Sequence, residues 1–141
     1  FGAARAATRA EPAAAPGAGA GTEGLVVLAH GSPLPQWHAS VERMVQDLAA
    51  AGGWVRAAYL PPAPPPLEAI TDQAAAAGMR RLVVVPYFLA DGLHVTRDIP
   101  ALVAAARARQ PAMDIRLAAS LEGHPALRTA VFARAAEADA G

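Results

Sequence analysis

Residues 85–100 read VPYFLADGLHVTRDIP and join an apolar run to a helical pattern, with one histidine, His94, between the two. The apolar run has the length of a strand, and the helical pattern follows from Ile99 onward. In an open parallel sheet, the loops at the carboxyl ends of the strands face the crevice in which ligands are held. His94 is therefore the first residue expected to take part in chemistry.

The same alternation of apolar run and helical period extends from Leu25 to the end of the chain. Short apolar runs at residues 25–29, 54–60, 81–85 and 113–119 predict buried strands. The segments between and after them repeat apolar residues every three or four positions and predict helices; these residues are Val41, Met44, Val45, Leu48, Leu67, Ile70, Ala74, Ala77, Ile99, Leu102, Val103, Ala106, Leu127, Val131 and Ala135. The pattern predicts an α/β fold, a three-layer sandwich with a four-stranded parallel sheet and right-handed crossovers.

The predicted domain covers residues 24–141, and 141 residues suffice for one domain with an ordinary core. Residues 1–23 are Ala, Gly and Pro with scattered Arg, a composition that predicts a disordered tail. The remnant of a transit peptide is the alternative interpretation of this segment.

Composition narrows the possible partners. Twelve basic residues balance twelve acidic ones, so no overall charge attracts nucleic acid or an anionic membrane. No apolar run approaches the roughly 20 residues that span a bilayer, and a cytoplasmic location is the default expectation. The chain has no cysteine, so a metal would be held by histidine and carboxylate. No Gly-x-Gly-x-x-Gly motif follows a predicted strand, and the sequence contains neither a phosphate-binding loop with Lys-Ser or Lys-Thr nor the nucleophile elbow of hydrolases.

A parallel sheet brings every strand-to-helix turn to one edge, so His30, the proline-rich residues 61–66, His94 and His124 are expected on one rim. His30-Gly31-Ser32 follow the first strand. Gly31 would allow close approach of a substrate that Ser32 orients. The alternative is a histidine satisfied by backbone groups in a turn, with Ser32 as a helix cap.

Two imidazoles on one rim suit a borderline divalent ion such as cobalt, nickel or ferrous iron. Two protein ligands leave coordination positions open, as expected for an ion that is handed on. His30 and His94 could instead act as bases near neutral pH.

Other residues near the rim have two interpretations each. Tyr87, Phe88 and Leu93 would form an apolar wall at the rim, although aromatic residues after a strand more often belong to the core. Arg97 would pair with substrate carboxylates or lie in solvent. Asp98 would favour the helix N-terminus or hold a histidine tautomer. His38 is expected at the surface or rim, with a ligand role as the alternative. His124 is expected to cap the last helix, with a functional role as the alternative.

The motif LAHGS at residues 28–32, followed by the motif at residues 85–100, resembles the short, single-domain CbiX-type chelatases, the sirohydrochlorin cobaltochelatase and ferrochelatase family. The resemblance extends from Leu25 to Ala136. It implies a chelatase-like sandwich fold that inserts a divalent metal into a carboxylate-rich tetrapyrrole, for cobalamin or sirohaem synthesis. It also implies metal contacts at His30 and His94, a homodimer, and no prosthetic group, because the metal (cobalt, iron or nickel) is a substrate.

One departure from the family pattern leaves an alternative open. Many members carry an acidic residue where the second strand ends, and this chain has Tyr59-Leu60-Pro61-Pro62 there. A non-catalytic metal-binding or tetrapyrrole-carrier domain is therefore the second hypothesis. A generic α/β module with two incidental histidines is the third. In the catalytic hypothesis, His30 and His94 hold the ion, and one of them accepts protons.

Overall fold

The computed structural model describes residues 21–141, apart from the side chain of His94. The first 20 residues of the predicted tail lie outside the described residues. Four parallel strands form one sheet in the order β2-β1-β3-β4. The strands are β1 (Glu23–Ala29), β2 (Trp54–Tyr59), β3 (Arg81–Pro86) and β4 (Asp114–Leu117). The predicted parallel sheet is confirmed.

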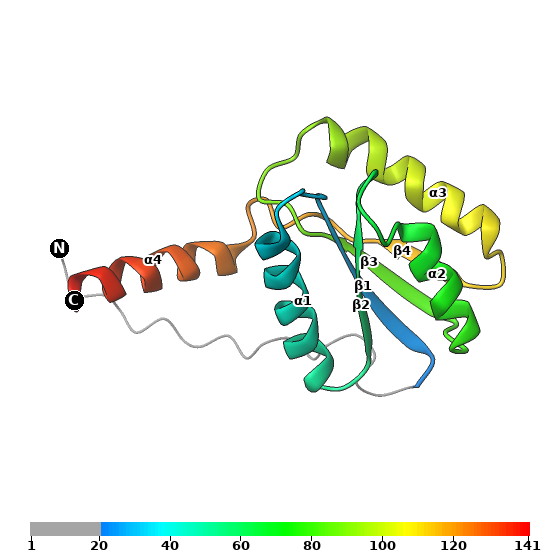
Figure 1. Ribbon diagram of the computed structural model, residues 1–141, viewed down its shortest axis with the longest axis horizontal. Helices are drawn as coiled ribbons and strands as arrows, with labels where there is room; N and C mark the ends of the chain where they lie inside the picture. The colour runs from blue at the N-terminus through cyan, green and yellow to red at the C-terminus, as the bar shows by residue number, and fades with distance from the viewer. Residues whose placement is uncertain (1–20) are drawn as a thin grey trace.

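Helices cover both faces of the sheet, as predicted (Figure 1). The helices are α1 (Pro35–Ala50), α2 (Leu67–Ala76), the π-helical turn η1 (His94–Asp98), α3 (Ile99–Arg109) and α4 (Pro125–Asp139). Helix α1 packs on one face, while α2 and α3 pack on the other. No helix within residues 21–141 has the length and apolar character needed to cross a membrane.

Strand β1 is the centre of the fold because it pairs with both β2 and β3. Six of its seven residues are buried, which explains the uninterrupted apolar run. The strand begins at Glu23, two residues before the predicted start. Glu23 lies beside Arg81 in the sheet, and its Oε1 forms an ion pair with Arg81 Nη1 at 3.3 Å. This pairing extends the strand beyond its apolar residues.

The strand order places the carboxyl ends of β1 and β3 at a point where the chain turns in opposite directions. From β1 the chain passes through α1 to β2, and from β3 it passes through α3 to β4 on the other side. Since α1 and α3 cover opposite faces, the loops after β1 and β3 separate and leave a crevice between them. His30 follows β1 directly, and His94 begins η1, which lies between β3 and α3, so the two residues belong to the segments that lead from β1 and β3 to the following helices.

Helix α4 departs from the predicted sandwich. The helix begins after His124, and the Nδ1 atom of His124 accepts a hydrogen bond from the Ala126 amide at 3.2 Å. The expected role of His124 as the cap of this helix is confirmed. However, no residue of α4 is buried, and the helix projects away from the sheet (Figure 1). Periodicity predicts a helix from its own residues, but the surface that covers it depends on the rest of the fold.

Tyr59, the last residue of β2, is only 2% exposed. Its hydroxyl donates to Glu42 Oε1 at 3.2 Å across the space between β2 and α1. Burial, followed by the negative charge of Glu42 and the hydrogen bond to it, raises the pKa of Tyr59 to about 12. The folded protein therefore keeps this proton at pH values at which an unfolded chain loses it.

We expect the free energy of unfolding to fall as the pH rises from about 10, where an unfolded tyrosine ionises, towards 12. The stabilisation that protonated Tyr59 gives to the folded state is complete below about pH 10. Between about pH 10 and 12, the free energy of unfolding falls by up to about 1.4 kcal/mol per pH unit. Urea unfolding at a series of pH values measures it. The Tyr59→Phe variant should lack this loss, whereas Tyr87→Phe, which changes the other of the two tyrosines, should retain it. Equal pH dependence of wild type and Tyr59→Phe would contradict the assignment.

Candidate functional site

Two side chains of α1 hold the loop that contains His30. Trp37 Nε1 donates to the His30 carbonyl oxygen at 2.6 Å. His38 Nε2 donates to the Ser32 carbonyl oxygen at 2.8 Å, because a carbonyl can only accept. His38 is half-buried and its ring packs on Tyr59, with the centroids 4.3 Å apart. His38 thus links the loop after β1 to Tyr59 at the end of β2.

Gly31 lies against the proline-rich connection. A Cβ atom at this position would lie 2.4 Å from the Ala63 Cβ and 3.0 Å from the Leu60 carbonyl oxygen. Residues 60–63 of the same chain therefore occupy the space next to Gly31. The expected contact of Gly31 with a substrate stays a prediction.

Ser32 closes the turn before α1 and does not cap the helix, because the N-cap residue of α1 is Leu34 and the helix start has no side-chain cap hydrogen bond. Its Oγ accepts from the Leu34 amide at 3.1 Å, at the start of α1. Gly31 and Ser32 also line a cavity of about 270 Å³ with His38 and the proline-rich loop, so the substrate role stays a prediction as well.

His30 borders two further cavities. One is an open cleft of about 400 Å³, which His30 shares with Leu60, Pro61, Asp98, Ala101 and Leu102. The other, of about 290 Å³, is formed with Trp37, Tyr87, Phe88 and Leu89. The sequence placed Tyr87 and Phe88 in an apolar wall, and both indeed line a cavity with His30. His30 thus lies between a carboxylate-bearing cleft and an aromatic one.

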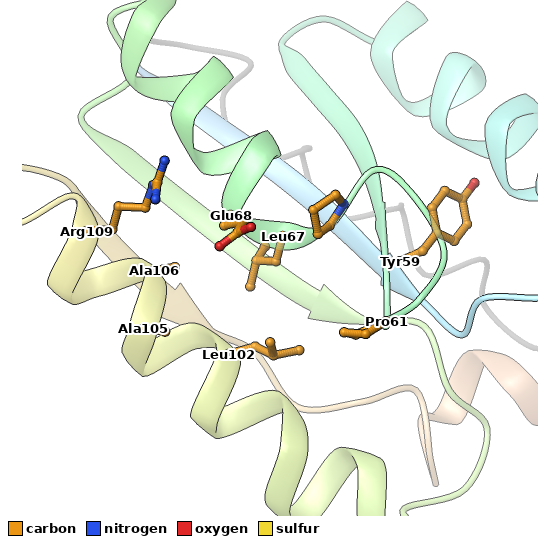
Figure 2. A pocket seen from close by; sticks show the side chains of 9 residues that line it. Tyr59, Pro61, Leu67, Glu68, Leu102, Ala105, Ala106 and Arg109 are labelled. Carbon is orange, nitrogen blue, oxygen red and sulfur yellow. The ribbon is translucent and has the colours of Figure 1, made fainter.

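An apolar groove between α2 and α3 adjoins the larger cleft, since Pro61 and Leu102 line both (Figure 2). The groove has a volume of about 200 Å³ and ends near Glu68 and Arg109. Arg109 binds both carboxylate oxygens of Asp72, at 2.9 and 2.7 Å. These hydrogen bonds, with one from Gln110, hold the pKa of Asp72 below its usual range.

His94 opens the π-helical turn that precedes α3. The turn is closed at its start by Thr96, whose amide and Oγ1 each donate to the Gly92 carbonyl at 3.1 Å. Turns of this kind are rare and often occur at functional sites. Asp98 is the N-cap residue of α3, but its side chain makes no cap hydrogen bond.

Asp98 lines the larger cleft together with His30. Its Oδ1 accepts from Arg97 Nε at 3.1 Å. The sequence suggested Asp98 as a helix-terminus charge or a partner of histidine, and its place in the His30 cleft could not be deduced from either role. The Arg97 side chain is 74% exposed, and Leu93 is 70% exposed. Their contacts with a substrate stay predictions.

A polar cluster that sequence reasoning missed joins the loops after β3 and β4. Ser120 Oγ donates to Asp91, and the Asp91 amide donates to Glu122 Oε2 at 3.3 Å. Hydrogen bonding with Asp91 and repulsion from its charge raise the pKa of Glu122. One signal in the sequence could have indicated this cluster: acidic residues follow both β3 and β4, and the carboxyl ends of these parallel strands lie at the same edge of the sheet. Among the described side chains, no group of three or more potential ligands is arranged to hold a metal.

Comparisons with known proteins show which family this chain is similar to. The CbiX family model matches residues 24–138. A sirohydrochlorin cobaltochelatase of Methanopyrus kandleri is 33% identical over 81 residues, which are 56% of this chain and 57% of that protein. One from Methanosarcina acetivorans is 34% identical over 83 residues, 57% of this chain and 63% of that protein. The matched segment thus spans little more than half the length of these relatives.

Solved structures share the fold. A CbiX protein from Marinobacter aquaeolei VT8 superposes with a TM-score of 0.74 at 30% identity, covering 82% of this chain and 95% of that one. The sirohydrochlorin chelatase SirB from Bacillus subtilis subspecies spizizenii, in complex with cobalt, superposes with a TM-score of 0.63. Its identity is 21%, over 68% of this chain and 42% of SirB, so this likeness concerns the fold alone.

We expect Gly31→Ala to destabilise the protein by about 1–3 kcal/mol, because the new methyl group overlaps Ala63. Thermal and urea unfolding measure the loss. The double variant Gly31→Ala with Ala63→Gly removes the 2.4 Å contact and should recover most of the stability. Failure of this rescue, with Ala63→Gly alone harmless, would show that the close packing of the two loops is not the cause.

Proposed function

The chain belongs to the CbiX family, and from that premise we propose that it inserts a divalent metal ion, cobalt or ferrous iron, into sirohydrochlorin, in cobalamin or sirohaem biosynthesis. The observation that carries the proposal is the position of His30. It follows the central strand at the crevice, between the cleft that contains Asp98 and the cavity lined by Tyr87 and Phe88. The similarity to sirohydrochlorin cobaltochelatases supports the substrate.

In this proposal, His30 and His94 bind the metal ion as it arrives. Strands β1 and β3 are direct neighbours, so the loops that carry the two histidines start side by side. Imidazole suits cobalt, nickel and ferrous iron. Two ligands leave positions for water and for the incoming pyrrole nitrogens, so that the ion can leave the protein for the macrocycle.

Insertion also releases two protons, because the two pyrrole N–H groups are replaced by bonds to the metal. A proton acceptor must lie near the ring centre, within hydrogen-bond reach directly or through water. We assign this role to Asp98, whose carboxylate lines the cleft of His30. A histidine that releases the metal becomes available as the second acceptor, and both pass their protons to solvent.

The walls of the two cavities would hold the macrocycle. Tyr87 and Phe88 offer apolar surface on which the ring can stack. Gly31, Ser32 and Leu93 would border it. The exposed Arg97 would bind the peripheral carboxylates, for which guanidinium is well suited.

One observation favours a carrier that does not catalyse insertion. At the end of the second strand, where the resemblance leads us to expect an acidic residue, Tyr59 and Leu60 are buried and Pro61 lines the cleft. A carrier would bind cobalt and sirohydrochlorin without raising the insertion rate above that in solution. The assays below separate these two functions.

We expect His30→Ala and His94→Ala each to lower the insertion rate by about 100-fold or more, because both the metal ligand and a base are lost. The absorbance change of sirohydrochlorin, followed with cobalt, ferrous iron and nickel in parallel, measures the rate. His124→Ala is the matched control, since His124 caps α4, and it should stay within about twofold of wild type. Unchanged rates in the first two variants would refute the ligand roles.

We expect Asp98→Asn to lower the turnover number by about 10-fold or more while cobalt affinity changes little, because the amide cannot accept the proton. Stability should change little, since the Asn side chain keeps an oxygen that can accept from the exposed Arg97 guanidinium. Single-turnover rates and cobalt titration give the two quantities. Loss of cobalt binding with unchanged turnover at saturating metal would assign Asp98 to the metal instead.

A further inference from the structure

The side chain of Trp37 is bonded to the main chain that carries His30. Trp37 lies in the first turn of α1, where its amide donates to the Leu34 carbonyl oxygen at 3.1 Å. Its indole Nε1 donates to the His30 carbonyl oxygen at 2.6 Å. An indole has a single N–H donor and no acceptor, so this bond satisfies it completely. Trp37 therefore ties the start of α1 to the point where the chain leaves β1.

The apolar side of α1 continues as far as Trp37. Trp37, Val41 and Val45 are spaced by four residues and so lie on one side of the helix. Val41 and Val45 are 1% and 5% exposed and pack in the cluster between α1 and the sheet. Trp37 packs against the edge of the same cluster but is only half-buried. Part of the indole thus remains uncovered at the rim.

This part of the indole lines the cavity of about 290 Å³ beside His30. Tyr87, Phe88 and Leu89 line the same cavity, which we call the aromatic cavity. Leu89 is 68% exposed, so the apolar lining reaches the surface. The described residues that line the cavity include no carboxylate, lysine or arginine. Such a lining suits the flat, uncharged face of a ligand.

Main-chain hydrogen bonds hold the walls of the aromatic cavity. The Tyr87 amide donates to the Leu28 carbonyl oxygen at 2.8 Å, and the Phe88 carbonyl oxygen accepts from the Leu121 amide at 3.1 Å. The cavity is therefore preformed, as ligand sites usually are. Pockets that enclose a drug-sized ligand have volumes of about 300 Å³ or more, so this cavity has room for one side of a larger flat molecule.

We infer that Trp37 has two separate roles: its N–H group positions His30, and the face of its indole binds the conjugated ring of the tetrapyrrole. This inference rests on the proposed function and adds a residue that no motif in the sequence indicated. Flat aromatic faces pack favourably on one another. The carboxylates at the periphery of the substrate would lie outside the aromatic cavity. One side chain thus connects the bound macrocycle to the position of the proposed metal ligand.

A purely structural role is the alternative, because Trp37 also contacts the apolar cluster beneath α1. Two substitutions separate the roles. Trp37→Phe keeps an aromatic face but has no N–H group. Trp37→Gln has no ring, but its side-chain amide nitrogen is as many bonds from Cβ as the indole nitrogen is, so it can still donate to the His30 carbonyl.

Insertion and binding assays of the full chain with cobalt and sirohydrochlorin test the two roles. Trp37→Phe should lower the single-turnover insertion rate about 10-fold or more, while the dissociation constant of metal-free sirohydrochlorin changes less than about threefold. Trp37→Gln should raise that dissociation constant about fivefold or more and keep the rate at saturating substrate within about threefold of wild type. Trp54→Phe is the matched control, because Trp54 begins β2 at the opposite edge of the sheet, and it should change neither quantity.

The outcomes separate this inference from the proposed function. Thermal unfolding establishes that each variant is folded. Parallel losses of rate and affinity in both Trp37 variants would assign Trp37 a structural role and overturn the inference. A wild type that binds sirohydrochlorin without accelerating insertion would contradict the proposed function instead.

The indole N–H groups provide a readout that does not depend on insertion. The chain has two tryptophans, so a proton–nitrogen correlation spectrum should show two indole signals, and Trp54→Phe identifies the signal of Trp37. Metal-free sirohydrochlorin should shift the Trp37 signal and leave the Trp54 signal in place, because the ring current of the macrocycle acts over short distances. An unshifted Trp37 signal at saturating sirohydrochlorin would overturn the inference, whether or not metal is inserted. No binding at all would contradict both the inference and the proposed function.

Discussion

The pairing of β1 with both of its neighbours is the constraint on which this structure depends. A strand buried on both faces and bonded at both edges must be apolar throughout, and residues 25–29 satisfy this condition. Because β2 and β3 lie on opposite sides of β1, the chain must leave the carboxyl ends of β1 and β3 in different directions. The crevice beside His30 follows from this arrangement of strands.

The loop after β1 is supported from several sides. The side chains of Trp37 and His38 donate to its carbonyl groups, and Ala63 lies where a side chain at position 31 would be. The proline-rich connection thus shapes the site even though it brings no carboxylate to it. A loop whose main chain is held in this way would lose little further main-chain freedom if His30 bound a metal in its proposed role.

The sequence predicts the elements of this fold well because each is encoded locally. Residues 25–29 and 81–85 are apolar runs, and Leu67, Ile70 and Ala74 share one face of a helix. Relations between distant residues are not encoded in this way. Asp98 lines the cleft of His30 because of where α3 packs. In the same way, Gly31 contacts Ala63 because of where the proline-rich loop packs. Periodicity also could not show that Val131 stays exposed, since the period predicts the helix and not whether its apolar side is covered.

The bonds from α1 to the rim end on the main-chain carbonyl groups of residues 30 and 32. Every amino acid carries a carbonyl group, so these bonds support the loop whatever side chain stands at position 30. The imidazole can therefore be exchanged for a thioether or a carboxylate without removing them. Under the proposed role of His30 as a metal ligand, substitutions at this one position would change the metal preference while the supporting bonds stay the same, because softer and harder donors favour different metals.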